Sequence, residues 1–273
     1  MVDAFIAGAD DASSVYYNPA GIASLEAAEA ITNVYLAHGV TWYEGGGRDT
    51  TSDNRVYVIP NLYLAAPVSD EGRWAVGLGA YAPFGLGSRW GNDYAFNANG
   101  QRVTVGEIEL VNINPTVAYR LTEDVSIGIG IDYYTGKLIN RYVQWYGPGT
   151  EGLVEGELDG DGWGCNIGLQ WQALPTVRFG ATYRSQVSVD YEGSVEFNSF
   201  PTVAGPVDMQ HNGSTGIDYP AMASAGVSWQ STSRLRLELA VEWDQWSTRE
   251  TQRFEIEGLP PAPPIPQDWQ DSW

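Results

Sequence analysis

The run Leu235-Arg-Leu-Glu-Leu-Ala-Val-Glu-Trp-Asp244 alternates between two kinds of side chain. Its odd positions are all apolar, whereas its even positions are Arg236, Glu238, Ala240, Glu242 and Asp244. Because successive side chains of a β-strand point to opposite faces, the pattern predicts a strand with one apolar and one hydrated face. Its length matches the roughly 9 to 11 residues that a tilted strand needs to cross the hydrocarbon layer.

The same pattern recurs along the chain in a larger repeated unit. From Val125 to Tyr134, isoleucines on one face stand opposite serine, glycine and aspartate on the other. In each unit, two alternating strands meet at a short polar turn, and their other ends enter long Gly- and Asp-rich stretches. The units begin at Asn61, Thr116, Ile167 and Ala225. Short turns at one end and long loops at the other predict an all-β protein, a transmembrane antiparallel up-and-down β-barrel.

Aromatic residues cluster at both edges of the predicted apolar band, where their amphipathic rings suit the lipid headgroup level. These residues are Trp74, Tyr119, Trp171, Phe179 and Trp229 near the short turns, and Tyr133, Tyr183 and Trp243 toward the far ends. The alternative is a soluble or surface β-sandwich that binds glycans or acts as an adhesin through exposed Trp and Tyr. A sandwich has no reason to keep every second connection short, which favours the barrel.

Composition narrows the possible functions. A net charge of -20 argues against nucleic acid as a partner, because few basic groups are available to neutralise phosphates. The single cysteine, Cys165, excludes a disulfide within the chain. We expect no enzyme activity, since there are only two histidines and no Gly-x-Ser-x-Gly motif. No cofactor or metal is expected either: Asp159-Gly-Asp-Gly162 lacks the later glutamate of a calcium loop.

The two ends of the chain differ from its middle. Asp10, Asp11 and the pair Asn18-Pro19 are typical of helix starts, so residues 1–30 are predicted to form an N-terminal helical hatch in the lumen. Residues 31–273 are predicted to form the barrel. About nine strands are expected, beginning near Ile31, Arg55, Arg73, Val103, Val125, Trp163, Thr176, Ala221 and Arg234. The Pro-rich stretch 258–273 does not suit a closing strand, so further C-terminal strands are expected to be missing. Met1-Val-Asp-Ala-Phe5 lacks the basic start and apolar run of a secretory signal, which we expect to have been removed or to lie outside this sequence.

Five stretches, in order along the chain, resemble the FadL-type outer-membrane transporters of long-chain fatty acids and other hydrophobic compounds. They are Asp10-Asp-Ala-Ser-Ser-Val-Tyr-Tyr-Asn-Pro-Ala-Gly21, Pro60-Asn-Leu-Tyr-Leu-Ala-Ala-Pro-Val-Ser69, Gly77-Leu-Gly-Ala-Tyr-Ala-Pro-Phe-Gly-Leu-Gly87, Val111-Asn-Ile-Asn-Pro-Thr-Val-Ala-Tyr-Arg120 and Ala181-Thr-Tyr-Arg-Ser185. The resemblance implies a barrel of about fourteen strands in a Gram-negative outer membrane. It also implies a monomer that contacts outer-membrane lipid and lipopolysaccharide, with passive uptake of a fatty acid, aromatic hydrocarbon or alkane.

The resemblance further implies an outward groove that collects ligand. The stretch after the third strand carries apolar candidates for this groove, namely Phe84, Leu86, Trp90, Tyr94 and Phe96. An exposed apolar patch often marks a binding surface. Alternatively, these rings pack the loop onto the barrel rim.

Ligand exit is predicted where strand pairing fails. Pro60 and Pro83 each lack a backbone N–H, and with Ala82 and Gly85 they mark a kink that the resemblance associates with a lateral opening. We hypothesise that Asn18, Pro19 and Ala20 of the hatch lie against this gap and move when ligand binds. In the alternative, both prolines only end strands.

A ligand carboxylate needs a cationic partner. Arg184 is the candidate because it lies on the hydrated face of its strand, and a guanidinium pairs well with carboxylates. The alternative is that Arg184 balances lumenal acids such as Glu238 and Glu242.

Overall fold

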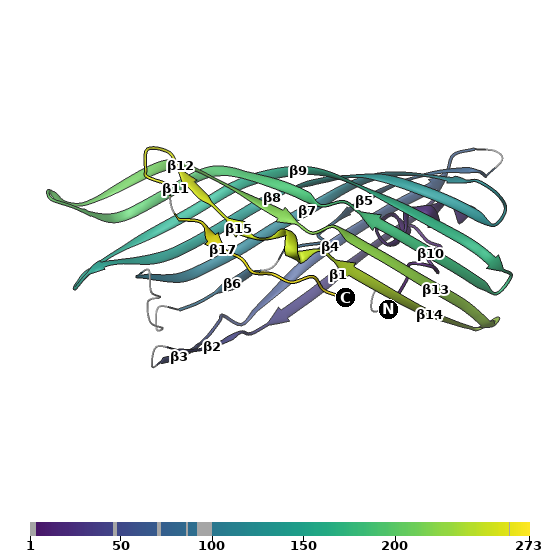
Figure 1. Cartoon of the computed structure of the whole chain (residues 1–273), viewed down its shortest axis with the longest axis horizontal. Coiled ribbons are helices and arrows are strands. Elements are labelled where there is room, and N and C mark those ends of the chain that lie inside the picture. The colour runs from purple at the N-terminus through teal and green to yellow at the C-terminus, as the bar shows by residue number, and fades with distance from the viewer. Residues whose placement is uncertain (1–3, 46–47, 70–71, 86, 92–99, 262) are drawn as a thin grey trace.

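The computed structural model describes residues 4–45, 48–69, 72–85, 87–91, 100–261 and 263–273. They form a strongly curved antiparallel sheet whose long strands lie side by side along the molecule (Figure 1). Nine strands follow one another along the described sheet: β1 (Glu29–Gly39), β4 (Arg55–Pro67), β5 (Trp74–Tyr81), β7 (Gln101–Arg120), β8 (Val125–Gly147), β9 (Thr150–Leu174), β10 (Val177–Arg184), β13 (Met222–Thr232) and β14 (Leu235–Asp244). This succession agrees with the predicted barrel wall.

The other elements branch from this path. β11 (Val187–Thr202) and β12 (Gly205–Tyr219) pair with each other, β11 also pairs with β9, and β6 (Gly87–Arg89) pairs with β7. The short strands are β2 (Trp42–Gly45), β3 (Arg48–Thr51), β15 (Thr251–Gln252), β16 (Phe254–Ile256) and β17 (Ile265–Pro266). The helical turns are α1 (Ser14–Tyr17), η1 (Pro19–Ser24) and η2 (Trp246–Thr248). No helix in the described ranges has the length and apolar character that crossing a bilayer requires.

The alternation predicted for 235–244 is confirmed. The leucines at 235, 237 and 239 are exposed on the convex side, and Leu239 retains 73% of its accessible surface. On the opposite face, Glu238 accepts hydrogen bonds from the backbone N–H groups of Ala7 and Gly8. No second sheet covers the leucines among the described residues, which excludes the β-sandwich alternative. An exposed apolar outer face suits lipid.

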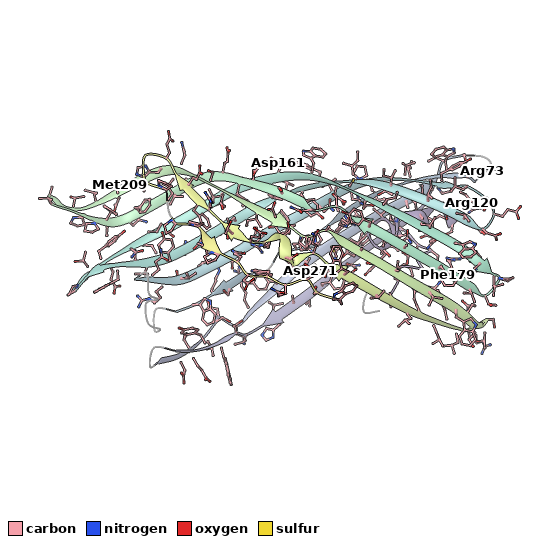
Figure 2. The ribbon with its side chains drawn as sticks, in the orientation of Figure 1. Arg73, Arg120, Asp161, Phe179, Met209 and Asp271 are labelled. Carbon is pink, nitrogen blue, oxygen red and sulfur yellow. The ribbon has the colours of Figure 1, made fainter. Side chains whose placement is uncertain are left out.

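The strands extend further than the sequence indicated. β8 and β9 have 23 and 25 residues, so most of the stretch predicted as a loop before Trp163 is strand. β11 and β12 were missed for a physical reason. Beyond Arg184 the polarity of the faces inverts: Val187 and Val189 are buried, whereas Ser188 and Asp190 are exposed. An outward face of polar residues belongs in water, so the hydrocarbon band ends near this level. Figure 2 shows Arg73, Arg120 and Phe179 toward one end of the molecule and Met209 toward the opposite end. Short turns occur at both ends, since β8 joins β9 through 148–149 and β11 joins β12 through 203–204, so the prediction of long loops at one end is wrong for these two connections.

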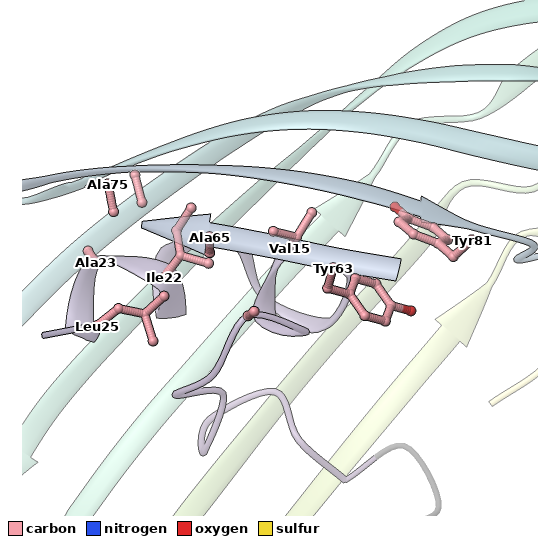
Figure 3. Close-up of a cluster of buried hydrophobic side chains, with 10 residues drawn as sticks. Val15, Ile22, Ala23, Leu25, Tyr63, Ala65, Ala75 and Tyr81 are labelled. Atoms are coloured by element: carbon pink, nitrogen blue, oxygen red, sulfur yellow. The ribbon is translucent and has the colours of Figure 1, made fainter. Parts of the chain in front are cut away.

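Residues 4–25, which we call the N-terminal segment, pack against the concave face. Val15, Ile22 and Ala23 are buried against Tyr63 and Ala75 of the wall (Figure 3). Polar contacts also hold the segment. Gln170 Nε2 donates to the carbonyl of Ala9 at 2.7 Å, and Arg120 Nη2 donates to the carbonyl of Ala23 at 2.5 Å. The wall therefore binds the segment through both apolar packing and hydrogen bonds. Its role as a movable hatch stays a prediction.

Candidate functional site: a side opening and its polar and aromatic surroundings

The wall is interrupted between β4 and the chain that follows β5. β4 pairs with β5 only from Leu62↔Ala80 to Pro67↔Ala75. Over Arg55–Asn61 the described pairing joins β4 to β1 alone, while β6 pairs with β7. We call the resulting opening, between residues 55–61 on one side and 82–85 and 87–88 on the other, the window. The Asp53 N–H donates to the Arg89 carbonyl at 2.8 Å, so backbone contact resumes beyond it.

All four residues predicted for the kink lie beside the window. Pro60 is on the β4 side, and Ala82, Pro83 and Gly85 are on the opposite side. Gly85 has a φ of 132°, and a Cβ there would lie 2.8 Å from the Ile108 carbonyl oxygen. This left-handed conformation and close approach favour glycine. The structure thus brings the four residues together, and their role in ligand exit stays a prediction.

Side chains rather than a backbone ladder bridge the outer half of the window. Glu107 of β7 is 4% exposed and accepts hydrogen bonds from Arg55 Nη1 at 2.7 Å and from Arg89 Nε at 2.7 Å. Tyr57 Oη donates to the Gly87 carbonyl at 2.8 Å. We call Arg55, Arg89 and Glu107 the clasp. The hydrogen bond from Arg89 lowers the pKa of Glu107 below its ordinary value. Glu107 therefore stays ionised at neutral pH, and its two ion pairs tie both margins of the window to β7.

A Glu107→Gln variant should test the clasp through its pH dependence. We expect the variant to be less stable than the native protein by about 1–2 kcal/mol at pH 7, since both arginines lose a charged acceptor and are partly exposed. Because folding lowers the pKa of Glu107, its contribution is full above the ordinary glutamate value of 4.5 and is lost as the pH falls through the lower folded value. Denaturant titrations from pH 7 to pH 3 should show the two curves converging. A constant difference across this range would contradict the assignment.

The Asn18-Pro19-Ala20 turn does not lie against the window, and that hypothesis is wrong. Asn18 Nδ2 donates to the carbonyls of Ile6 and Leu169, at 2.8 and 3.1 Å. A Cβ on Gly128 of β8 would lie 2.3 Å from the Pro19 carbonyl carbon, so only glycine admits the turn there. The turn is held by β8 and β9, whose glycines allow close backbone approach. A different part of the segment approaches β5: the ring of Tyr16 lies 4.9 Å from that of Tyr81, centroid to centroid.

Phe84 lies in the lumen instead of an outward groove. Its ring centroid is 5.0 Å from that of Tyr219 and 5.9 Å from that of Trp246, and it packs against a buried cluster. The reason is the kink itself, which turns the chain after Ala82 toward β7. Trp90 is half-buried and its Nε1 donates to Ser88 Oγ at 3.0 Å. The other predicted groove residues, Leu86, Tyr94 and Phe96, lie outside the described residues.

Arg184 is buried in an ion pair with Asp132 of β8. Its Nη2 donates to the Tyr16 carbonyl at 3.3 Å, and its guanidinium lies over the ring of Tyr16 at 5.4 Å. Arg184 was considered either as the partner of a ligand carboxylate or as the balance of a lumenal acid. The geometry supports charge balance, although the acid is Asp132 rather than Glu238 or Glu242. Ligand carboxylate binding by Arg184 stays a prediction.

A small cavity of about 50 Å³ lies between the N-terminal segment and the wall at this level. It is lined by Ile6, Tyr16, Tyr17, Thr182, Arg184, Met222, Ser224 and Glu242. Sites for small molecules are typically several hundred Å³, so a ligand of that size needs rearrangement to fit here. Within the described ranges, no three His, Cys, Asp or Glu side chains are placed to hold a metal ion.

Sequence reasoning missed the partners of Arg184 and the centre of the clasp. Asp132 was recognised only as one member of a polar face, and Glu107 was not singled out. A carboxylate on the inward face of a strand is a usable signal, because such a charge is costly unless paired. The partner of such a carboxylate depends on which strands become neighbours in the sheet, and the presence of the carboxylate in the sequence does not indicate this.

These features define a class of protein: an outer-membrane β-barrel with an apolar outer face, a side opening and an N-terminal segment packed inside. A family model described as "Outer membrane protein transport protein (OMPP1/FadL/TodX)" matches residues 4–273, and the chain belongs to this family. Its location is the outer membrane of a Gram-negative bacterium.

Two curated relatives illustrate the similarity. The chain is 25% identical to the long-chain fatty acid transport protein of Escherichia coli O6:H1 (strain CFT073) over 69% of this chain and 48% of that protein. It is 24% identical to outer membrane protein P1 of Haemophilus influenzae (strain Rd) over 88% of this chain and 61% of that protein. The chain thus spans about half the length of the curated relatives it matches.

Solved structures share the fold. The Pseudomonas putida toluene transporter TodX matches with a TM-score of 0.76 at 16% identity, covering 99% of this chain and 76% of that one. A Pseudomonas aeruginosa FadL homologue matches with a TM-score of 0.75 at 18% identity, covering 98% of this chain and 72% of that one. At these identities the likeness concerns the fold alone.

Proposed function

We propose that the chain forms part of an outer-membrane channel for the passive uptake of long-chain fatty acids or other hydrophobic molecules, which leave sideways through the window. The observation that carries this proposal is the window itself, which lies beside a buried cluster that contains the rings of Tyr134, Tyr191 and Tyr219. We call it the aromatic cluster. Phe84 enters that cluster immediately after Ala82 and Pro83 at the window margin. An apolar ligand among these rings thus lies close to an opening in the wall.

Physical chemistry favours such a path for an apolar cargo. Each buried CH₂ contributes about 0.8 kcal/mol, so an aqueous pore would forfeit the stabilisation that an apolar route preserves. Leaving through the wall places the ligand directly in lipid and avoids the aqueous compartment below. The E. coli relative is named as a fatty acid transporter and TodX as a toluene transporter, which supports this ligand class.

The proposed mechanism includes movement of the N-terminal segment as a hatch. The cavity beside Arg184 is far smaller than such ligands, so a ligand that presses on this level from the aromatic side would displace the segment rather than occupy the cavity. Tyr16 contacts Tyr81, the residue before Ala82, and its carbonyl accepts from Arg184. Displacing Tyr16 would therefore disturb the window margin directly. Contact through Tyr16 replaces the Asn18-Pro19-Ala20 contact in this scheme.

Uptake before and after blocking the window tests the proposal. In an Ala82→Cys variant that also carries Cys165→Ser, attaching a bulky charged maleimide should abolish uptake of labelled oleate and toluene. Binding measured by tryptophan quenching should persist, because the block lies at the exit. Uptake that is unaffected by the modification would refute lateral exit.

The native cysteine provides the matched control. Cys165 is exposed on β9, distant in strand order from the window, so modifying it in the native protein should leave uptake unchanged. An Ala82→Ser variant, which adds little volume, should also retain uptake.

A further inference from the structure

Four buried polar residues on successive strands form what we call the polar belt. They are Asn112 of β7, Asp132 of β8, Asn166 of β9 and Arg184 of β10. Asp132 is the centre: Asn112 Nδ2 donates to Oδ1 at 2.6 Å, Asn166 Nδ2 donates to Oδ2 at 3.0 Å, and Arg184 completes an ion pair. Asn112 Nδ2 also donates to Tyr81 Oη at 3.1 Å. The belt therefore crosses the concave face and reaches the end of β5.

The belt separates two apolar regions, and the order is the same along each strand. On β7, Ala118 belongs to the cluster around the N-terminal segment, Asn112 to the belt and Leu110 to the aromatic cluster. On β8, Gly128 faces the Asn18–Ala20 turn, whereas Tyr134 lies in the aromatic cluster beyond Asp132. We call these regions the lower cluster, which contains Val15 and Ile22, and the upper cluster, which contains Tyr134 and Tyr219. A ligand moving from the upper to the lower cluster has to cross the belt.

The window opens on the upper side of the belt. Tyr81 is bonded to the belt, Ala82 and Pro83 follow it at the window margin, and Phe84 packs in the upper cluster. Three consecutive residues thus lead from the window margin into the upper cluster without passing the belt.

The polar groups of the belt make the insertion of a hydrocarbon chain energetically unfavourable. An ionised Asp132 only accepts hydrogen bonds, so both asparagine Nδ2 groups must face it and their Oδ1 atoms must point elsewhere. Within the part of the chain that the structure describes, neither Oδ1 has a hydrogen-bond partner, although both side chains are almost fully buried. A hydrocarbon cannot satisfy these acceptors, and inserting it between Asp132 and Arg184 would leave two buried charges unpaired.

We propose that the polar belt is a barrier that the hydrocarbon part of a ligand does not cross, so that a ligand in the upper cluster leaves through the window instead of passing the N-terminal segment. This inference rests on the proposed function. It adds a reason for the direction of exit that the window alone does not supply: the route downward is closed by charge and hydrogen-bonding chemistry as well as by packing.

Photo-crosslinking in cells that express the full-length protein tests the barrier. The probe is a diazirine-bearing alkylbenzene added from outside, and labelled residues are mapped by mass spectrometry. In the native protein we expect labels at Tyr134 and Tyr219 and none at Val15 and Ile22. In an Asp132→Leu, Arg184→Met variant, which replaces the ion pair with apolar groups of similar size, labelling of Val15 and Ile22 relative to Tyr134 should rise by about tenfold or more.

Each outcome decides a separate question. Labels at Val15 in the native protein, or confinement to the upper cluster in the variant, would overturn the barrier. No labels in the upper cluster of the native protein would instead refute the proposed function and the barrier with it. A Lys137→Met, Glu157→Gln variant removes an exposed ion pair between β8 and β9 and should label like the native protein. If the apolar variant does not assemble, Asp132→Asn with Arg184→Met removes the same charges more conservatively, and the native labelling pattern remains decisive.

Discussion

The Arg184→Leu variant is expected to lose about 3–5 kcal/mol of folding stability, because removing one partner of a buried ion pair leaves the other charge uncompensated. Asp132 has no accessible surface, and the two asparagines that donate to it cannot neutralise its charge. Contacts to the N-terminal segment are lost as well, since Arg184 donates to the Tyr16 carbonyl. Urea titration of the folded protein in detergent, followed by tryptophan fluorescence, measures the change.

A double-mutant cycle distinguishes a charge effect from lost packing. Adding Asp132→Leu removes the stranded carboxylate, so the double variant should regain most of the lost stability. As a control, Lys137→Met breaks an exposed ion pair with Glu157 and should leave the urea midpoint unchanged. A double variant no more stable than Arg184→Leu would show that side-chain packing, not the buried charge, is responsible.

The Gly128→Ala variant is expected to unseat the N-terminal segment and to raise ion conductance through the lumen severalfold. The added Cβ would lie 2.3 Å from the Pro19 carbonyl carbon and 2.5 Å from the Ala20 nitrogen, both backbone atoms that no side-chain rotation can move aside. The segment must shift as a body, which weakens its hydrogen bonds to Leu169 and Gln170. Single-channel recording in planar bilayers, together with sensitivity of cells to small hydrophilic antibiotics, measures the outcome.

A glycine elsewhere in the wall supplies the comparison. A Cβ on Gly156 of β9 would meet its nearest atoms at 3.8 and 3.9 Å, which is ordinary contact, so Gly156→Ala should conduct like the native protein. Equal conductance in both variants would indicate that the wall yields at Gly128 and that the segment keeps its place.

The orientation of individual strands could be predicted because it depends on a local period. Leu237 and Glu238 face opposite sides wherever the strand lies, so alternation alone assigned one to lipid and the other to the lumen. The same reasoning failed for 187–219 because it sought an apolar outward face. Above the hydrocarbon band, water replaces lipid, and Val187 and Val189 point inward instead. The two-residue alternation continues in these strands, but the outward side chains are polar because they face water instead of lipid.

Partners within the lumen could not be predicted in the same way. The alternation of side chains placed Arg184 on the hydrated face of its strand, but it did not indicate its level along the barrel axis or which strands lie beside it. Glu238 and Glu242 were therefore considered as its acidic partners, and Asp132 was not. The antiparallel register of β8, β9 and β10 brings Asp132 and Arg184 to one level. For the Asn18-Pro19-Ala20 turn, the deciding factor was the position of Gly128 and Gly168, which leave room for backbone on that part of the wall.

The sequence by itself therefore determined the β-class and the membrane-facing side of strands such as 125–134 and 235–244, since both follow from residues close together in the chain. With the family resemblance, it also indicated Pro60 and Pro83 as the place where pairing fails. Only the tertiary structure decided that Phe84 turns inward, that Arg184 pairs with Asp132, and that Tyr16 rather than Asn18 approaches the window. Those outcomes depend on strand register and on the space left by small residues on distant strands, and both arise only when the sheet curves around the N-terminal segment.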